Sequence, residues 1–294
     1  MDVLIIGATG YVGSAIDRAL TERGHRTIAT ARSEVARAKL EARGTAVVSA
    51  DAGKPQTLTD HVKTADAVVY CVSATDRDPF QVDLEAIRAI ARAMAGTERT
   101  MVYVSGTWVY GTTDGTADES APLQPPALVA RRPELERMVL NMVRIGIRGH
   151  VVRPGIVYGN GGGIPAMFVQ SARERQASSI VGDGTNRWAT IDCDDLGRLV
   201  ASVIERGKPG AVYNAVGDGA FTVREIAEAA SRGAGAEGRT ITVDPDILGP
   251  FGACLTLDQS VSATRAKNDL GWSPSAGSIL EDIERGSYRA QLAT

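Results

Sequence analysis

The sequence predicts an α/β protein built on a doubly wound parallel sheet, with a smaller C-terminal lobe. A short apolar run at residues 3–6 leads directly into three evenly spaced glycines. Strand-like apolar runs then alternate with amphipathic helical stretches up to about residue 105, a pattern typical of right-handed βαβ units. Beyond residue 160 the alternation loosens, and 294 residues at 44% hydrophobic suffice for one large core and an added lobe.

The first turn carries the strongest functional signal. Glycines 7, 10 and 13 lie between the first strand and a helix over residues 14–20, and a new strand follows Gly24. Such glycines allow a sharp turn, close approach of a pyrophosphate and close helix packing, although ordinary turns contain them too. The strand before and the helix after favour a Rossmann-type site for a dinucleotide. The residues expected to contact the cofactor are Gly7, Thr9, Gly10, Tyr11, Val12 and Gly13.

The second strand, at residues 25–31, ends where the adenosine ribose of a dinucleotide would lie. An acid at this end would favour NAD, whereas a basic residue pairs with the 2′-phosphate of NADP. The sequence has Arg32 and Ser33 there, with Arg37 one helical turn further on. We therefore expect NADP, with NAD less favoured; the alternative is a solvated arginine at a helix start.

The next two strands complete the first half of the sheet. They are expected at residues 46–49 and 67–72, with a short helix at 58–64 between them. Cys71, Val72 and Ser73 end the second of these strands, and small side chains there suit a backbone that passes beside the cofactor.

A long helix, a fifth strand and a polar loop follow. Residues 80–95 carry Leu84, Ile87, Ile90 and Met94 on one helical face. The strand at 101–105 ends at Ser105, expected beside the cofactor. The loop at 112–126 is polar and proline-punctuated and is expected near the carboxyl ends of the strands, where such sheets bind ligands. A helix at 132–144 and a sixth strand at 150–156 come next.

The later segments are expected to build the smaller lobe. A glycine-rich hinge at 160–163 precedes a helix at 164–174 and a loop at 180–188. Helices at 196–204 and 223–231, the latter capped by Thr222, flank a strand at 211–215, and a last helix ends at Arg285. We expect residues 1–159, with 189–215 returning to them, to form the dinucleotide-binding core. Residues 160–188 and 216–294 would form the lobe.

Several motifs together resemble the extended branch of the short-chain dehydrogenase/reductase superfamily, which holds nucleotide-sugar epimerases and dehydratases. The motifs are the glycine turn, Ser105 with Val109-Tyr110-Gly111, Arg153-Pro154-Gly155 with Val157-Tyr158-Gly159, Asp194-Asp195, and Leu270-Gly271-Trp272 with Pro274. The resemblance implies that the glycine turn binds the diphosphate and that the late segments form a substrate lobe. It also implies that Asp51, with Ala52, lies at the adenine and that Pro154, Gly155 and Ile156 border the nicotinamide, although Asp51 also suits a plain turn.

The resembled family uses a Tyr-x-x-x-Lys pair and a Ser or Thr for proton transfer, and this chain departs from all three. Spacing puts Leu128 at the tyrosine position, Arg132 at the lysine position and Gly106 at the Ser/Thr position. Neither leucine nor arginine can exchange a proton at a working pH. The remaining candidates for the reacting oxygen are Thr107, Tyr110 and the acids Asp114, Asp118 and Glu119, with Arg132 holding ribose or substrate as a fixed cation.

The other potentially reactive side chains are expected to have structural roles. Tyr110 and Tyr158 are also expected as packing residues of the family. His25, His61 and His150 fall away from the expected cleft and are expected at the surface. The cysteines Cys71, Cys193 and Cys254 lack metal-ligand spacing and are expected to be reduced core residues, so no metal site is expected.

Composition limits the partners. A formal charge of −3 and a pI near 5.7 argue against nucleic acid or an anionic membrane surface. The first strand begins too early for a signal peptide and no apolar run reaches membrane-spanning length, so a cytoplasmic protein is expected. The expected partner is a small-molecule substrate, and a homodimer is one of the assemblies that the sequence allows.

Three functions stay open at this point. The first is an NADP-dependent oxidoreductase, epimerase or dehydratase of small-molecule metabolism with non-standard proton-transfer residues. The second is a non-catalytic dinucleotide-binding sensor or partner-binding protein. The third is an isomerase or cyclase that uses the same pocket without hydride transfer. The missing pair favours the second and third, whereas the retained cleft sequences favour the first.

Overall fold

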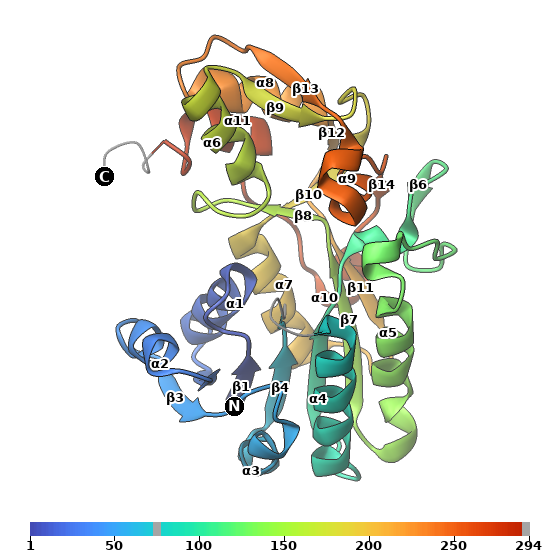
Figure 1. Ribbon diagram of the computed structural model, residues 1–294. Coiled ribbons are helices and arrows are strands. Elements are labelled where there is room, and N and C mark those ends of the chain that lie inside the picture. The colour runs from blue at the N-terminus through green and yellow to red at the C-terminus, as the bar shows by residue number, and fades with distance from the viewer. Residues whose placement is uncertain (73–77, 290–294) are drawn as a thin grey trace.

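The computed structural model describes residues 1–72 and 78–289 and has the predicted doubly wound α/β architecture (Figure 1). One parallel sheet has seven strands in the order β11-β7-β5-β4-β1-β2-β3. Their bounds are β1 Asp2–Ile6, β2 Arg26–Ala31, β3 Ala46–Ser49, β4 Ala67–Tyr70, β5 Thr100–Val104, β7 Arg148–Pro154 and β11 Val212–Ala215. The carboxyl ends of all these strands therefore meet at one edge, which is where the candidate site lies.

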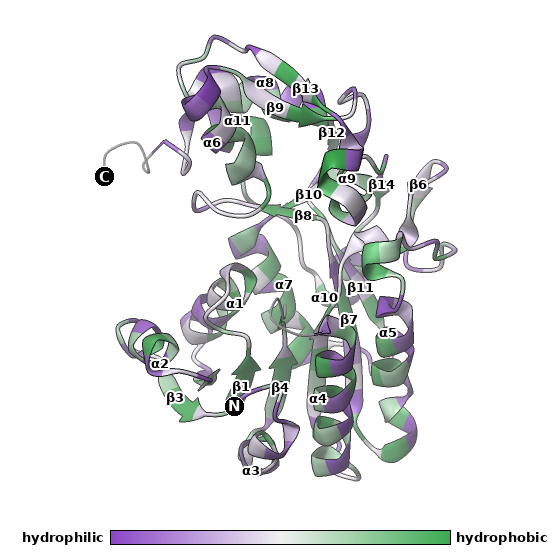
Figure 2. Cartoon of the chain, viewed as in Figure 1, coloured by the Kyte–Doolittle hydropathy of each residue, from purple (hydrophilic) through white to green (hydrophobic). Residues whose placement is uncertain are grey.

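The central strands of this sheet are buried on both faces because helices cover both, whereas β3 at the edge is only partly buried. Along β1, Val3 and Ile5 pack into one apolar cluster while Leu4 and Ile6 pack into another on the opposite face. Side chains alternate across a strand, so a continuous apolar run is what a doubly covered strand needs. Figure 2 shows the apolar colouring concentrated in the sheet and on the helix faces turned toward it.

Helices from both halves of the chain form the two covering layers. One layer holds α1 (Tyr11–Glu22), α2 (Glu34–Glu41) and α7 (Cys193–Arg206), and the other holds α3 (Thr59–Thr64), α4 (Pro79–Met94) and α5 (Arg132–Leu140). Helix α4 begins with the Asp78 carboxylate accepting from the Phe80 amide, and its predicted apolar stripe is buried. Helix α5 ends at Leu140 and continues as a 3₁₀ turn, η4 (Asn141–Ile145), earlier than predicted.

The sixth predicted strand is in fact two strands in two different sheets. After β7 the chain leaves the large sheet at Gly155, and β8 (Ile156–Tyr158) pairs instead with β10 (Arg187–Asp192), which also pairs with β12 (Ala220–Thr222). A Cβ at Gly155 would lie 2.4 Å from the Ala189 carbonyl oxygen, so only glycine allows the crossing. Strand β10 therefore does not join the large sheet, although α7 and β11 pack in the core.

The remaining elements form a second layered unit above the strand ends (Figure 1). Its core includes Phe168 stacked on Trp188 at 5.6 Å between ring centroids. Part of the predicted loop at 180–188 is strand, because β9 pairs with the distant β13. The Thr222 capping box at the start of α8 is confirmed. The bounds here are α6 Pro165–Arg175, β9 Ser178–Val181, α8 Val223–Gly233, β13 Thr240–Val243, α9 Gly249–Leu255 and α11 Ile279–Arg285, with β6 Thr116–Ala117, β14 Ser260–Val261 and α10 Thr264–Leu270 at the junction.

Short 3₁₀ turns connect several of these elements, namely η1 Pro55–Thr57, η2 Thr107–Tyr110, η3 Ala127–Val129 and η5 Pro245–Leu248. Among the described helices, none has both the length and the apolar character needed to cross a membrane. The division into a core and a lobe at the predicted residue boundaries stays a prediction.

One surface prediction is wrong. His150 on β7 is fully buried, and a Cβ at Gly207 would lie 2.8 Å from its ring, so the imidazole packs tightly inside the fold. Burial lowers the pKa of His150, which keeps the ring neutral. His25 is half-buried and contacts Glu205 at 3.1 Å.

Candidate functional site

The glycine turn after β1 is fixed by backbone contacts that leave no room for a side chain at Gly7 or Gly13. Gly7 has φ +108°, and its added Cβ would lie 2.7 Å from the Cys71 carbonyl oxygen. The Gly10 amide donates to the Gly7 carbonyl at 3.1 Å, and Gly10 is the N-cap of α1. A Cβ at Gly13 would stand 2.2 Å from the Gly7 oxygen. The turn therefore presents the free amides of α1 to the space above the strand ends.

A cavity of about 410 Å³, the first cavity, opens above this turn. Predicted cofactor residues in its wall are Gly7, Thr9, Gly10, Tyr11, Val12, Gly13, Arg32, Asp51, Ala52, Cys71 and Val72. The sequence analysis missed Ile6, Thr30, Ala36, Ala50, Gly53 and Val82, which complete it. Most of the missed residues are small or apolar, so they carry no chemical signal of their own.

Of the three residues predicted at the ribose, only Arg32 lines the first cavity. The Ser33 hydroxyl instead caps α2 by accepting from the Ala36 amide at 3.2 Å. Arg37 donates to the Ser49 hydroxyl at 2.7 Å and to Glu41 at 3.3 Å, on the outer side of α2. Ser73 lies outside the described residues.

Lys39 is a contact of the glycine turn that sequence reasoning missed. Its ammonium donates to the Thr9 carbonyl oxygen at 2.9 Å, which ties α2 to the turn. A lysine on an exposed helix gives no sequence signal for such a contact, because the fold alone brings residue 39 to residue 9.

A second cavity of about 280 Å³ continues from the first. The two share the wall residues Tyr11, Val12, Cys71 and Val72. Predicted residues in the second wall are Ser105, Thr107, Arg132, Pro154, Gly155 and Ile156. Its further lining consists of Val104, Gly106, Trp108, Val157, Gly163 and Ile164. The two cavities therefore adjoin one another at the carboxyl edge of the sheet.

Thr107 lies in the second cavity but its proton is already engaged. The hydroxyl donates to the Gln259 side-chain oxygen at 3.1 Å, and the Gln259 amide donates to the carbonyls of Thr107 and Gly111 at 2.8 Å each. Two carbonyl acceptors fix which way the amide points. With the proton held in this way, the Thr107 oxygen is left as an acceptor toward a ligand.

Tyr110 belongs to a buried polar network and is absent from the walls of both cavities. Its hydroxyl donates to the Asn214 side-chain oxygen at 2.8 Å and accepts from Arg153 at 2.7 Å. Arg153 in turn pairs with the buried Glu136 carboxylate. Burial raises the pKa of Tyr110, and the Arg153 charge opposes this. This placement favours the packing role that the sequence left open, and it explains Arg153 in the motif before Pro154.

The three loop acids lie away from the reacting space, since none of them is in the wall of either cavity. Asp118 accepts from the Ser120 amide and hydroxyl at 2.8 and 2.6 Å, and these bonds lower the Asp118 pKa. Glu119 accepts from the Asn214 amide at 2.9 Å. Asp114 is exposed. Two of the acids therefore order the loop.

The positions expected for the catalytic pair hold Leu128 and Arg132, and the two side chains are placed differently. Leu128 is half exposed on η3 and is not in the wall of either cavity, whereas Arg132 lines the second cavity. Nearby on α4, the Asp83 carboxylate accepts from the Tyr70 hydroxyl at 2.7 Å. Burial raises the pKa of Asp83 to about 6, against the lowering effect of the Tyr70 bond and the Arg132 charge.

Tyr11 is the tyrosine in the cavity walls, and its hydroxyl is also engaged. It donates to the Gly159 carbonyl at 2.6 Å, and its ring packs against Gly162 and Gly163 of the hinge. Burial is the largest cause that raises the pKa of Tyr11. Tyr11 thus connects the glycine turn to the start of the lobe rather than offering a proton to a ligand.

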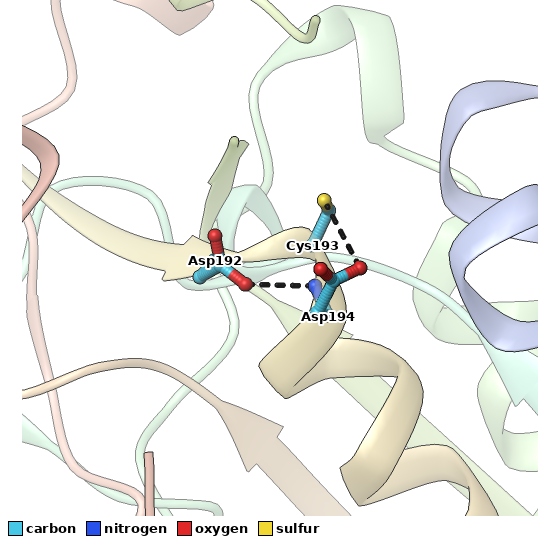
Figure 3. A group of neighbouring side chains, drawn as sticks. All are labelled: Asp192, Cys193 and Asp194. Atoms are coloured by element: carbon cyan, nitrogen blue, oxygen red, sulfur yellow. Dashed lines mark hydrogen bonds between the residues drawn. The ribbon is translucent and has the colours of Figure 1, made fainter. Parts of the chain in front are cut away.

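Asp192, Cys193 and Asp194 gather at the start of α7 (Figure 3). The Asp192 carboxylate is the helix cap, accepting from the amides of Asp194 and Asp195 at 2.8 and 3.2 Å. Asp194 pairs with Arg18. Burial raises the pKa of the Cys193 thiol to about 11, so the thiol stays protonated. These contacts account for the cluster as a helix start, and we assign no metal to it.

The late motifs meet around Asp195. Its carboxylate accepts from the Ser275 and Ala276 amides at 3.0 and 2.9 Å, and its carbonyl accepts from the Trp272 indole at 3.2 Å. These contacts fasten the segment that precedes α11 to the start of α7. Asp195 and Trp272 are therefore structural partners.

Comparison with solved structures shows the same fold over the full chain. A dTDP-glucose 4,6-dehydratase double mutant from Streptomyces venezuelae, with NAD bound, has a TM-score of 0.85 at 20% identity and covers 99% of this chain and 97% of its own. A UDP-glucose 4-epimerase from Thermus thermophilus in complex with NAD has a TM-score of 0.82 at 19% identity, with full coverage of both chains. The chain thus has the fold of these two NAD-binding enzymes.

Sequence comparison then gives the family. The model of the NAD dependent epimerase/dehydratase family matches residues 3–216, and the chain belongs to this family. An uncharacterized protein of Saccharomyces cerevisiae is 30% identical over 98% of this chain and 99% of its own. A UDP-glucose 4-epimerase of Mycolicibacterium smegmatis is 26% identical over 93% of this chain and 94% of its own.

Proposed function

We propose that this protein is an NADP-dependent oxidoreductase-, epimerase- or dehydratase-like enzyme that acts on a small metabolite with non-standard proton-transfer residues. The observation that carries the proposal is the continuity of the two cavities through Tyr11, Val12, Cys71 and Val72. A dinucleotide is long enough to need both, with its diphosphate at the glycine turn and its nicotinamide beside Pro154. The family description, which names NAD dependence, supports a nicotinamide dinucleotide as the cofactor but not the choice of NADP.

The preference for NADP rests on Arg32. Arg32 lines the first cavity just after the end of β2, where the ribose of a bound cofactor would lie. A guanidinium there can form a charge-assisted bond to a 2′-phosphate. The solved relatives described above carry NAD, so this preference would distinguish the chain from them.

The residues near the nicotinamide end support binding and orientation more than acid–base work. When bound, the nicotinamide supplies the hydride chemistry. Arg132 stays protonated and can only hold an anionic or hydroxyl group, and Thr107 offers an acceptor oxygen. A proton would then come from water or from a group on the substrate. This restricts the reaction to one that tolerates a weak acid catalyst.

A second candidate is a non-catalytic dinucleotide-binding protein. It is favoured by Leu128, which stands half exposed at the position expected for the proton donor. A redox-neutral isomerase or cyclase is compatible with the same cavities. Turnover measurements distinguish all three.

The test measures cofactor binding and turnover separately. NADPH and NADH are titrated into purified protein and followed by nucleotide fluorescence. Each is then incubated with a panel of aldehydes, ketones and nucleotide-sugars. We expect NADPH to bind more tightly and to be oxidised with part of the panel, and Thr107→Val to slow turnover without changing the NADPH Kd. Binding with neither oxidation of the cofactor nor conversion of any member of the panel would favour the non-catalytic candidate. Conversion of a panel compound without net oxidation would indicate a redox-neutral reaction, and absence of binding would refute the proposal.

A further inference from the structure

Gly106 and Arg132 occupy one space in the second cavity. A Cβ built on Gly106 would lie 3.0 Å from an Arg132 guanidinium nitrogen and 3.8 Å from the Pro154 carbonyl oxygen. A serine or threonine at residue 106 would therefore require the guanidinium to shift. The glycine and the arginine are matched to one another, and together they place a cation where a hydroxyl is expected.

The charge of Arg132 is available to a ligand. Within residues 1–72 and 78–289, no hydrogen bond or ion pair engages its guanidinium. The neighbouring Arg131 differs, because it pairs with Glu134 at 3.1 Å and stacks on the Phe80 ring at 3.4 Å from the centroid. Asp83 lies within electrostatic range of Arg132 but is bonded to Tyr70 instead.

Ser105 supplies a second, independent sign of a ligand in the same cavity. The residue is 6% exposed and lines the second cavity. Its hydroxyl is buried and has no partner among the described residues. Buried hydroxyls are nearly always hydrogen-bonded, so an orphan in a cavity wall indicates a bond that a bound molecule completes.

We propose that the second cavity binds a small molecule through its carboxylate, which the Arg132 guanidinium holds, while the Ser105 hydroxyl bonds a neighbouring polar group of the same molecule. A planar guanidinium matches a carboxylate with two parallel bonds. The rest of the wall is largely apolar, with Trp108, Ile156 and Ile164, so one negative charge matches the one cation better than a doubly charged phosphate would. The volume of about 280 Å³ limits the ligand to a few carbon atoms beside a nicotinamide.

This inference rests on the proposed function, because the carboxylate would lie beside the nicotinamide end of the cofactor. The competing role for Arg132 is to hold the cofactor ribose. If Arg132 holds a carboxylate, replacing it with an uncharged residue should remove the preference for an acid over its amide. If Arg132 holds the cofactor ribose, the same replacement should weaken cofactor binding.

The experiment uses protein saturated with NADPH and measures binding of three probes, acetate, pyruvate and benzoate, each against its neutral amide by calorimetry. At least one acid is expected to bind about ten- to a hundredfold more tightly than its amide. Arg132→Met should abolish this ratio and leave the NADPH Kd within about twofold, and Arg132→Lys should restore part of the ratio. Gly106→Ser should lower it by displacing the guanidinium, and Arg131→Met is the matched control that should not change it.

Each other outcome overturns the inference in a recognisable way. If no acid is preferred over its amide while NADPH still binds, the carboxylate site is wrong and the proposed function stands. If Arg132→Met weakens NADPH about tenfold and leaves the acid-to-amide ratio unchanged, the residue serves the ribose. If wild-type protein does not bind NADPH at all, the proposed function itself fails. Thermal unfolding of each variant confirms that it is folded.

Discussion

The two cavities that meet at Tyr11 are built from different kinds of atoms. The first is shaped by backbone: three glycines in a turn, the amides of α1, and small residues at the ends of β2 and β3. The second is shaped by side chains, including Trp108, Thr107 and Arg132, that come from elements far apart in sequence. A backbone-built site depends on a short motif, whereas a side-chain-built site changes its chemistry with single substitutions.

The difference explains why one half of the site matches its family and the other departs from it. A pyrophosphate needs amides and space, which the glycine spacing supplies whatever the substrate. Proton transfer needs a particular side chain at a particular place, and the spacing of the sequence predicts Leu128 and Arg132 at those places. Variants that act on one cavity should therefore leave the other intact.

The largest effect is expected from Gly10→Val in the first cavity. A Cβ at Gly10 would lie 3.4 Å from the Gly7 oxygen, an ordinary contact, so the fold should survive while the branched side chain fills the phosphate space. Affinity for NADPH should fall about a hundredfold or more, measured by fluorescence titration.

Gly13→Ala is the contrasting variant for this test. Its Cβ would lie 2.2 Å from the Gly7 oxygen, so it should lower the free energy of unfolding by about 1–3 kcal/mol as well as weaken binding. Unchanged NADPH affinity in folded Gly10→Val would show that the first cavity is not the diphosphate site.

A smaller effect is expected from Arg32→Ala, which removes the cation at the end of the first cavity. The preference for NADPH over NADH should fall by about ten- to a hundredfold, the value of a charge-assisted bond. Arg37→Ala is the control, since its guanidinium bonds Ser49 and Glu41 and is outside the cavity wall. An equal loss of NADPH preference in both variants, or no loss in Arg32→Ala, would contradict the assignment of Arg32 to the 2′-phosphate.

The features that the sequence could predict are those set by local patterns, and the features that it could not predict depend on distant contacts. The βαβ alternation identified the strands of the large sheet and the apolar face of α4, because periodicity is a local property. The exchange of partner sheets at Gly155 and the pairing of β9 with β13 depend on contacts between distant segments, which no local pattern encodes. His150 was misplaced for the same reason, since a lone polar residue before a strand gives no sign of full burial.

The candidate site divides in the same way. The glycine turn and Pro154–Ile156 could be predicted at the site from sequence because the backbone there has special requirements, and they line the two cavities. The bonds from Gln259 to Thr107, and from Lys39 to Thr9, join residues whose proximity exists only in the folded chain. The orphan Ser105 hydroxyl likewise becomes visible only when its surroundings are known.

Tyr110→Phe tests whether the Tyr110 hydroxyl, next to the second cavity, has a structural or a catalytic role. Removing the hydroxyl leaves the Arg153 donor and the Asn214 acceptor without their partner, at a cost of about 1–3 kcal/mol in the free energy of unfolding. The NADPH Kd should not change, because Tyr110 is outside both walls. Chemical denaturation and fluorescence titration measure the two quantities. A large fall in turnover with unchanged stability would instead make Tyr110 a catalytic residue.

The smallest expected effect concerns Asp83, which lies behind the second cavity beside Arg132. Burial raises the pKa of its carboxyl to about 6, so between about pH 4 and 6 the folded state holds a proton that the unfolded chain has released. Stability contributed by this group is therefore present at low pH and is lost as the pH rises to about 6. Two pKa units correspond to about 3 kcal/mol, and solvent screening of the partly buried side chain reduces this to about 1 kcal/mol.

Asp83→Asn isolates that contribution, because an amide oxygen can still accept from the Tyr70 hydroxyl but does not titrate. The free energy of unfolding of wild type, minus that of the variant, should fall by about 1 kcal/mol between pH 4 and pH 7. Urea denaturation at each pH measures it, with Asp60→Asn on the exposed face of α3 as the control. A flat difference would mean that the Arg132 charge already holds the carboxylate ionised in this window. In that case the negative charge of Asp83 would neutralise the positive charge of Arg132, which would then hold a ligand carboxylate less tightly. The pH dependence of stability therefore tests whether the second cavity contains a side-chain cation that is available to a ligand.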